Sequence, residues 1–287
     1  MKKRASAILT SDWHLRETTP VCRTDDFWTT QMNKINFIYS LQRKHKCPVL
    51  HAGDLFHHWK PSPYLLSMVI GTLPDQFATV YGQHDLPQHS LDLKDKSGIY
   101  VLESAIWVTV LDGCSWGQLP EAPSIEIGGR KILVWHNFTY IGKDPWPGCN
   151  APKAYALLEK YKQFDLIVTG DNHQSFTFRS PNGNLLVNPG SLTRQDADQI
   201  DFQPKVYLYY AETNEVEVVE IPIEMGVITR DHIEKVQERD DRIDAFVSSL
   251  NTDFSATISF EKNMEMFLQT NRIRKDVKNI IYKSMEV

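Results

Sequence analysis

The chain up to residue 225 alternates short apolar runs with longer amphipathic segments. Short apolar runs bounded by Gly, Pro or Asp predict strands, and apolar positions that recur every three or four residues predict helices. On this basis we expect strands within 5–12, 47–54 and 75–85, with helices at 25–45 and 61–73 between them. Such alternation is typical of an α/β domain.

The pattern changes twice further along the chain. After a short helix expected within 95–104, strands dominate, and one helix near 153–161 interrupts them. These strands are expected in "IWVTVL", "SIEIGG", "RKILVWHN", "DLIVTGDN", "SFTFRSPNG", "NLLVNPGS", "KVYLYYAE" and "EVEVVEIPI". Beyond Gly226 the pattern predicts only helices. We therefore expect a first domain at 1–225 and a helical region at 226–287 that caps it or docks a partner.

Composition narrows the class of protein. The 287 residues are 41% hydrophobic and 23% charged, which is enough apolar sequence for a substantial core. Four cysteines lie far apart without a CxxC pair, which argues against a disulfide scaffold and fits a reducing compartment. The first apolar run stops at Leu9, too early for a secretory signal, and no stretch reaches the ~18 apolar residues of a membrane span. We expect a soluble cytoplasmic protein that binds no membrane.

The net charge of −5 gives no sign of a polyanionic partner, so any surface for nucleic acid must be local or supplied by metal. Metal-binding residue types do follow the predicted strands. Ligands of α/β sheets bind outside the carboxyl ends of the strands, so residues far apart in sequence can meet there. The residues in question are Asp12, His14, Asp54, Gln83, His84, Asp85, His136, Asp171 and His173. So many acids and histidines in one crevice require a positive charge to hold them together.

Each motif taken alone has a simpler interpretation. A "GD" pair after a strand is more often a turn that caps the next helix. A single histidine such as His136 is more often a core residue, and "GDNH" alone is a good turn sequence. Their joint occurrence, always at a strand end, favours a metal centre.

In this order, "SDWH", "GDLF", "GQHD", "WH", "GDNH" and "NPGS" resemble the signature of the calcineurin-like metallophosphoesterases, over residues 8–192. Within that superfamily, "GDLFHHWKPSP" and "NPGSLTR" are most similar to the DNA double-strand-break repair nucleases of the SbcD type. The resemblance implies a four-layer αββα sandwich that holds two divalent metal ions, with Mn²⁺ expected and Mg²⁺ as the alternative. It also implies exonuclease and endonuclease hydrolysis of DNA in repair or recombination.

The resemblance assigns the metal ligands by position. Asp12, His14 and His173 correspond to the ligands of one metal, Gln83, His136 and Asp171 to those of the other, and Asp54 to the bridging carboxylate. Two metals about 3.5 to 4 Å apart can activate a bridging water and neutralise the charge that develops on a phosphodiester.

Three further residues correspond to substrate-handling positions. His84 is implied to lie beside the scissile phosphate, oriented by Asp85, where it stabilises the transition state or protonates the leaving oxygen. His57 matches a position that leads the DNA backbone to the metals. Trp59 in the same loop either stacks on an unpaired base or packs under the loop.

Two ligand positions depart from the family pattern. Gln83 stands where the family usually has Asn, and Asp171 stands where it usually has His. Both belong to the same expected metal, which therefore has more oxygen ligands and should prefer Mn²⁺ or Mg²⁺ to Zn²⁺. The alternative is a second site that binds loosely and fills only with substrate.

Alternatives remain open for the role of the C-terminal helices and for the substrate. Members of the SbcD type pair with an SbcC-type SMC-like ATPase through C-terminal helices, and homodimers are common among them. The candidate docking residues are an apolar seam of Ile233, Val236, Ile243, Val247 and Leu250, and a basic amphipathic segment at 272–287. Besides a nuclease, a phosphoesterase for small nucleotides or phosphoproteins and a catalytically weak scaffold remain candidates.

Overall fold

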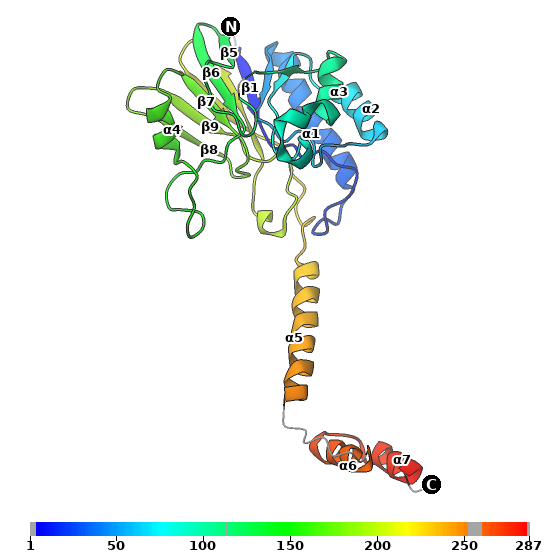
Figure 1. Ribbon diagram of the computed structural model, residues 1–287. Helices are drawn as coiled ribbons and strands as arrows, with labels where there is room; N and C mark the ends of the chain where they lie inside the picture. The colour runs from blue at the N-terminus through cyan, green and yellow to red at the C-terminus, as the bar shows by residue number, and fades with distance from the viewer. Residues whose placement is uncertain (1–3, 113, 252–259, 286–287) are drawn as a thin grey trace. The chain divides into compact units, whose positions relative to one another are not determined.

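The computed structural model describes residues 4–112, 114–251 and 260–285, without the side chains of 245–251, 260, 261 and 285 (Figure 1). The chain divides into two compact units, 1–230 and 231–287. The first is a mixed α/β domain and the second consists of helices.

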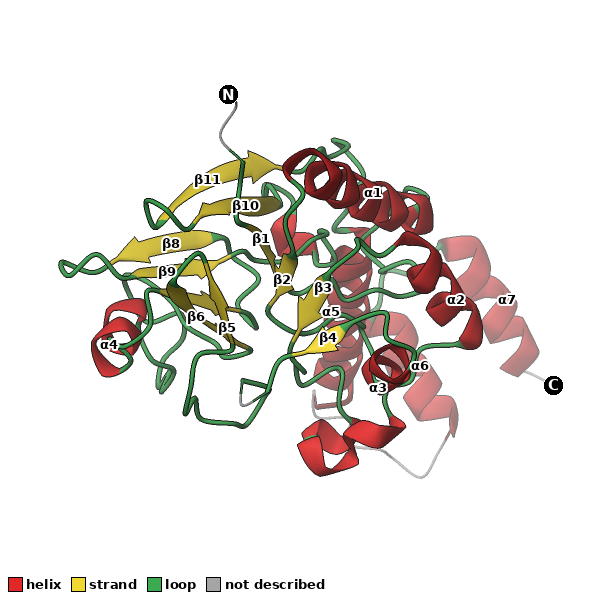
Figure 2. Ribbon diagram, turned by 90° about the horizontal axis from the view of Figure 1, so that it is seen from above, coloured by secondary structure: helices red, strands yellow, loops and turns green. Residues whose placement is uncertain are grey.

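Two β-sheets form the centre of the first unit (Figure 2). The six-stranded sheet has the order β11 (Glu215–Glu220), β10 (Lys205–Tyr210), β1 (Ala7–Thr10), β2 (Val49–His51), β3 (Phe77–Thr79) and β4 (Thr109–Val110). The five-stranded sheet has the order β5 (Ile125–Ile127), β6 (Arg130–Trp135), β7 (Leu166–Thr169), β9 (Leu185–Asn188) and β8 (Phe176–Arg179). Strands β1 to β4 are parallel, as are β6, β7 and β9, so each sheet presents several carboxyl ends at one edge.

Helices cover the outer faces of both sheets. The helices α1 (Phe27–His45), α2 (Pro63–Thr72) and α3 (Gly98–Ser104) lie beside the larger sheet, and α4 (Ala154–Lys160) contacts β8 and β9 of the smaller one (Figure 1). Short 3₁₀ helices lie at Pro87–His89, Leu91–Lys96 and Ala197–Gln199. The arrangement is the expected four-layer αββα sandwich, although its fourth layer is the single short helix α4.

The alternating direction of the side chains along β1 explains why this strand is buried between two layers. Ile8 packs in the core that includes residues of α1, α2 and α3, whereas Ala7 and Leu9 pack in the core that joins the two sheets. Side chains of a strand point to opposite faces in turn, so a continuous apolar run such as "AILT" is buried on both sides.

Local capping fixes where the helices begin. The Asp26 side chain accepts a hydrogen bond from the backbone N–H of Thr29 at the start of α1. Ser62 and Ser97 do the same for α2 and α3, and Pro63 occupies the first turn of α2. These caps set the entry point of each helix that follows a strand, and with it the position of the loops between them.

The second unit comprises α5 (Asp231–Asn251), α6 (Phe260–Thr270) and α7 (Lys275–Met285). Lys278 of α7 donates a hydrogen bond to the carbonyl oxygen of Leu268, whose side chain is fully buried. Ile233, Val236 and Ile243 on α5 are 41%, 47% and 50% exposed, while the side chains of Val247 and Leu250 lie outside the described residues. Among the described residues, none of the helices combines the length and apolar character that crossing a bilayer requires.

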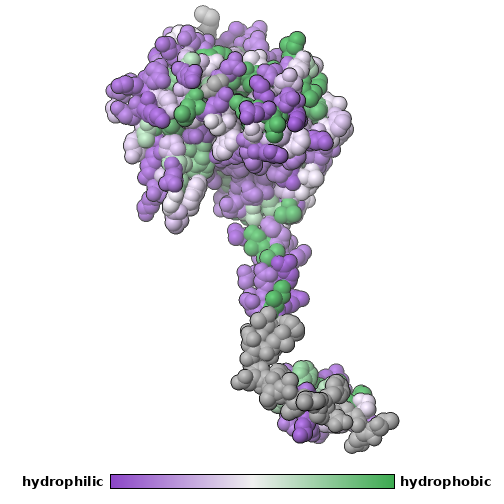
Figure 3. Space-filling model, viewed as in Figure 1, coloured by the Kyte–Doolittle hydropathy of each residue, from purple (hydrophilic) through white to green (hydrophobic). Residues whose placement is uncertain are grey.

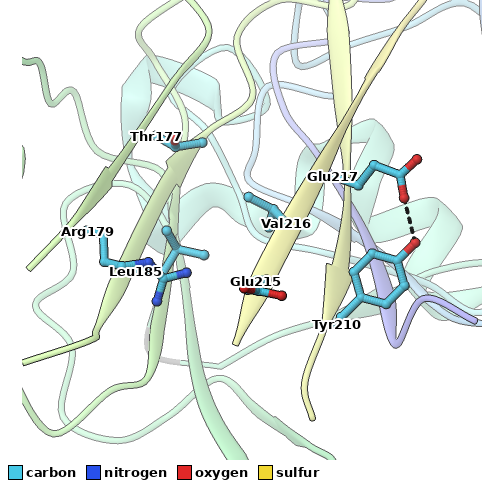
Figure 4. A pocket seen from close by; sticks show the side chains of 7 residues that line it. All are labelled: Thr177, Arg179, Leu185, Tyr210, Glu215, Val216 and Glu217. Carbon is cyan, nitrogen blue, oxygen red and sulfur yellow. Dashed lines mark hydrogen bonds between the residues drawn. The ribbon is translucent and has the colours of Figure 1, made fainter. Parts of the chain in front are cut away.

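The surface of the first unit is largely hydrophilic on the face shown in Figure 3, and apolar side chains are visible along α5. One hollow of the first unit lies between β8 and β11 and includes the hydrogen bond from the Tyr210 hydroxyl to Glu217 (Figure 4). None of the site residues predicted from the sequence lines this hollow.

Candidate metal centre

The predicted site residues leave the carboxyl ends of five strands. They lie in the loops after β1, β2 and β3 of one sheet and after β6 and β7 of the other. Two glycines allow these loops to approach each other. A Cβ atom at Gly82 would lie 2.1 Å from Oδ1 of Asp54, and one at Gly170 would lie 2.3 Å from the carbonyl oxygen of Ala52. Only a residue without a side chain fits such contacts.

Asp12, His14 and His173 form one group of possible ligands. The Nε2 atoms of His14 and His173 are 3.1 Å apart, and they lie 3.9 Å and 4.0 Å from Oδ1 of Asp12. Two nitrogens at about 2.1 Å from a common cation would be separated by about 3 Å. The structure therefore brings together Asp12, His14 and His173, which the resemblance assigns to one metal.

Asp54 lies between two histidines from different sheets. Its Oδ2 atom is 3.6 Å from Nε2 of His14 and 3.5 Å from Nε2 of His136. Its Oδ1 atom accepts a hydrogen bond from the backbone N–H of His84. One carboxylate thus faces the ligands of both expected metals, which is the position that a bridging ligand occupies.

Four site residues share a backbone conformation that L-amino acids rarely adopt. The φ angles of Asp12, His14, Asp54 and Asp171 are 50°, 44°, 57° and 71°. Each such residue costs about 1–3 kcal/mol and persists only where the surroundings hold it. The strain is concentrated in the loops that aim the acids and His14 at one another.

Several ligand atoms at the centre are buried without a hydrogen-bond partner among the described residues. They are Oδ2 of Asp12, Oδ2 of Asp54, Oε1 of Gln83, and Nε2 of His136. An unsatisfied buried polar atom costs about 1–3 kcal/mol, and several in one place call for a common partner. His136 donates from Nδ1 to the carbonyl oxygen of Ala52 at 2.6 Å, which leaves Nε2 as the ring nitrogen for a proton or a metal ion. The residues present therefore fit divalent cations.

The electrostatics of the centre favour positive charge. Burial alone would lower the pKa of His136, but the Asp54 carboxylate, with Asp12 and Asp171, raises it to about 10. Burial likewise opposes ionisation of Asp54, yet His136 and His14 hold the pKa of that carboxyl below its usual value. The pair of Asp54 and His136 thus favours a positive charge between them, which a proton or a metal cation can supply.

The two departures from the family pattern contact each other. Nε2 of Gln83 donates a 2.6 Å hydrogen bond to Oδ1 of Asp171. The backbone N–H of Asp171 donates to Oδ1 of Asp12 at 3.1 Å, which places this loop beside the first group of ligands. Gln83 and Asp171 therefore lie next to each other and beside Asp12.

His84 is positioned differently from the expectation. Its Nδ1 atom lies 3.0 Å from the carbonyl oxygen of His57 and donates to it, so Nε2 is the ring nitrogen that this contact does not use. Asp85 does not orient this ring. Its buried carboxylate accepts hydrogen bonds from the backbone N–H groups of Gly82, Leu55 and Phe56, and thereby ties the loop after β3 to the loop after β2.

A small cavity of about 110 Å³ opens beside these rings. His14, His57, His84 and His173 all line it. The rings of His57 and His84 stack with centroids 5.8 Å apart, and burial, followed by Arg16, lowers the pKa of His57 to about 4. His57 is thus placed beside His84, whereas Trp59 in the same loop is half-buried with its ring 5.3 Å from that of His58.

Sequence reasoning gave no role to the residues that support the "GDNH" loop. The side-chain amide of Asn188, which is fully buried, donates to the carbonyl oxygens of Asn172 and Gln174. At Gly190, where φ is 78°, a Cβ atom would lie 2.6 Å from the carbonyl oxygen of His173. The signal was present in the motif "NPGS", whose Asn and Gly perform this support.

A family profile described as "Calcineurin-like phosphoesterase superfamily domain" matches residues 7–211. No curated protein matches the chain.

Solved structures that match the chain include two Vps29 proteins. One is Vps29 complexed with zinc from Entamoeba histolytica, at 16% identity and a TM-score of 0.35, covering 75% of this chain and 99% of that chain. The other is vacuolar protein sorting 29 from Cryptosporidium parvum, at 19% identity and a TM-score of 0.36, covering 76% and 97%. Because the matched family profile spans most of the sequence, this chain belongs to the calcineurin-like phosphoesterase superfamily.

Proposed function

We propose that this chain is a metal-dependent nuclease that hydrolyses phosphodiester bonds of DNA, as an exonuclease and endonuclease, in repair or recombination. The observation that carries the proposal is the convergence of unpartnered buried ligand atoms around Asp54 beside the free Nε2 of His84. A phosphodiester is an anion that resists attack, so its hydrolysis needs concentrated positive charge and a proton donor.

The chemistry is divided between the metals and the chain. Two divalent cations, when bound, would supply an activated water and neutralise the charge developing on the phosphate. Asp12, His14 and His173 would hold one cation, Gln83, His136 and Asp171 the other, and Asp54 both. His84, fixed by the carbonyl oxygen of His57, would deliver a proton from Nε2 to the leaving oxygen.

Mn²⁺ is the metal that we propose, with Mg²⁺ as the alternative. The candidate ligands include oxygen atoms of Asp12, Asp54, Gln83 and Asp171 beside the histidine nitrogens. Such a mixed set, rich in carboxylate and amide oxygen, suits Mn²⁺ and Mg²⁺ better than the nitrogen and sulphur sites of Zn²⁺.

DNA is the substrate that the loop after β2 supports. The segment "GDLFHHWKPSP" resembles that of SbcD-type nucleases, and its His57 lines the cavity beside His84. The hydrogen bond between Gln83 and Asp171 favours a second candidate, because two ligands that satisfy each other hold a metal less firmly. In that case the chain would be a catalytically weak scaffold.

Activity on a panel of substrates tests the proposal. End-labelled single-stranded and double-stranded DNA would be compared with bis-nitrophenyl phosphate, cyclic nucleotides and a phosphopeptide, each with Mn²⁺. We expect both DNA substrates to be degraded. Hydrolysis of small esters or phosphopeptide with DNA left intact would replace the nuclease by another phosphoesterase, and inactivity on all substrates would favour the scaffold.

We further propose that residues 226–287 dock an SbcC-type SMC-like ATPase. The half-exposed apolar residues Ile233, Val236 and Ile243 of α5 support this, because buried interface cores are apolar. Ile243→Asp should abolish copurification with a coexpressed ATPase of this class while DNA cleavage by the chain alone persists. Equal copurification of wild type and variant would contradict the assignment of this surface.

A further inference from the structure

The cavity beside the metal centre contains one arginine that none of the roles above uses. Arg16 lines it together with His14, His57, His84 and His173, and it is the only Lys or Arg among the lining residues. Its side chain is half-exposed, so it can meet a ligand from solvent. A permanent cation thus lies next to the place where an anionic substrate would be hydrolysed.

The backbone of Arg16 is held from both sides. The buried side chain of Gln31 on α1 accepts a hydrogen bond from its N–H at 3.1 Å and donates one to its carbonyl oxygen at 2.8 Å. The preceding residue, Leu15, is fixed by a parallel bridge to Phe56 in the loop after β2. These contacts hold the backbone of Arg16 beside the cavity that its side chain lines together with His14.

The guanidinium group of Arg16 is only partly used by the protein. Its Nε donates to the hydroxyl of Thr18 at 2.9 Å. Its two terminal nitrogens make no hydrogen bond within the described part of the chain, and no ion pair within 4.0 Å there either, although Asp196 lines the same cavity. Two parallel N–H donors on a fixed plane are the arrangement that binds two oxygens of a phosphate.

We propose that Arg16 forms a subsite for the phosphate group that adjoins the scissile one in the DNA strand. The inference rests on the proposed nuclease function, because only a substrate with successive phosphates would use both places. The metals and His84 act on one phosphodiester, whereas Arg16 holds its neighbour and so fixes the register of the strand over the centre. Arg16 is therefore a positioning residue.

The competing explanation is that Arg16 only balances the charge of Asp196 at the surface. In that case Asp196→Asn should tighten DNA binding by the same factor in the wild-type and Arg16→Gln backgrounds, because it only removes a negative charge. If Arg16 binds phosphate, Asp196→Asn also removes a competitor for its guanidinium group, so the gain should be larger in the wild-type background than in Arg16→Gln.

Binding without metal tests the subsite directly. A fluorescently labelled single-stranded 12-mer would be titrated in EDTA, by anisotropy, at salt concentrations from 50 to 200 mM. We expect Arg16→Gln to weaken binding about 5- to 30-fold and to reduce the salt slope by about 0.7, the contribution of one phosphate contact on a single strand. Arg16→Lys, which keeps the charge but loses the fork, should fall between wild type and Arg16→Gln.

Arg43→Gln is the matched control, because it removes the same charge from the exposed end of α1, where Arg43 lies over the ring of Tyr39. Equal affinity and equal salt slope for the Arg16→Gln and Arg43→Gln proteins would overturn the subsite. Failure of the wild type to bind in EDTA would overturn it as well, since the chain alone forms the subsite.

A second readout separates this inference from the function on which it rests. With Mn²⁺, Arg16→Gln should raise KM for DNA more than it lowers kcat, and should lose more activity on DNA than on bis-nitrophenyl phosphate, which has a single phosphate group. Wild type that cleaves DNA, with Arg16→Gln unchanged on it, contradicts the subsite alone. Wild type that binds DNA through Arg16 but never cleaves it contradicts the nuclease alone.

Discussion

The side-chain amide of Gln83 donates a 2.6 Å hydrogen bond to Oδ1 of Asp171, so the two residues that depart from the family pattern are partners. Gln83 has a longer side chain than the usual Asn, and it reaches the carboxylate of Asp171. Its Oε1 atom stays buried without a partner among the described residues. The pair therefore keeps an amide oxygen available as a ligand while it exchanges a nitrogen ligand for a carboxylate.

Removing the charge at this position should affect one metal more than the other. Asp171→Asn replaces an anionic oxygen by a neutral one, so we expect one of two Mn²⁺-binding steps in isothermal titration to weaken about 10- to 100-fold. Asp75→Asn, at an exposed turn before β3, removes the same charge elsewhere and should leave both steps unchanged. Equal weakening of both steps would show that Asp171 does not bind one metal in preference to the other.

His84 should matter most where the leaving group needs a proton. Because its Nε2 is free to face substrate, His84→Ala should lower kcat for DNA about 10²- to 10⁴-fold. On bis-nitrophenyl phosphate, whose nitrophenolate leaves without protonation, the loss should be much smaller. Losses of the same size on both substrates would assign His84 to charge stabilisation rather than to proton transfer.

Two glycines provide a matched test of close packing. A Cβ atom at Gly82 would overlap Asp54, so Gly82→Ala should destabilise the fold by about 1–3 kcal/mol and weaken Mn²⁺ binding. Gly71 lies in α2 with no neighbour within 4 Å of an added Cβ, so Gly71→Ala should be neutral or stabilise by about 0.5–1 kcal/mol. Urea unfolding measures both, and a stable Gly82→Ala protein that binds metal normally would refute the packing argument.

Lys34 should make stability depend on pH in the alkaline range. It is 5% exposed on α1 and donates to the carbonyl oxygen of Pro222, and burial, together with Arg194 and Arg23, lowers its pKa from 10.5 to about 7. Between these two values the unfolded chain holds a proton that the folded chain lacks, so stability rises with pH there.

Lys34→Met removes that titration. The variant should gain stability relative to wild type, by about 4 kcal/mol at pH 7 and by only about 1 kcal/mol at pH 10. Unfolding free energies from urea titrations at the two pH values measure the change. A gain that is the same at both would show that Lys34 is not perturbed by burial.

The strands and their order along the chain follow from local pattern. Runs such as "AILT" and "LIVT" are apolar without alternation, which is what burial on both faces of a sheet requires, and the structure places β1 and β7 there. The helices α1, α2 and α3 begin at Asp26, Ser62 and Ser97, residue types that favour caps, and capping depends on only a few adjacent residues.

The pattern of hydrophobic and polar positions did not predict the contacts between loops. The resemblance implied that Asp85 orients the ring of His84, yet its carboxylate binds backbone groups, including those of Leu55 and Phe56. The partner of His84 is the backbone carbonyl oxygen of His57. Every residue has such a group, so the sequence does not show which one binds a side chain. The sequence did not point to Arg16 either, because hydrogen bonds with the side chain of Gln31 on α1, fifteen residues away, set the position of its backbone.

Cleavage of end-labelled single-stranded and double-stranded DNA, in Mn²⁺, Mg²⁺ or EDTA and beside His84→Ala, tests the account most directly. We predict degradation in Mn²⁺, weaker degradation in Mg²⁺, none in EDTA, and almost none by the variant in any metal. DNA that stays intact with every metal, or that is degraded equally in EDTA or by His84→Ala, would contradict a metal-dependent nuclease assisted by this histidine.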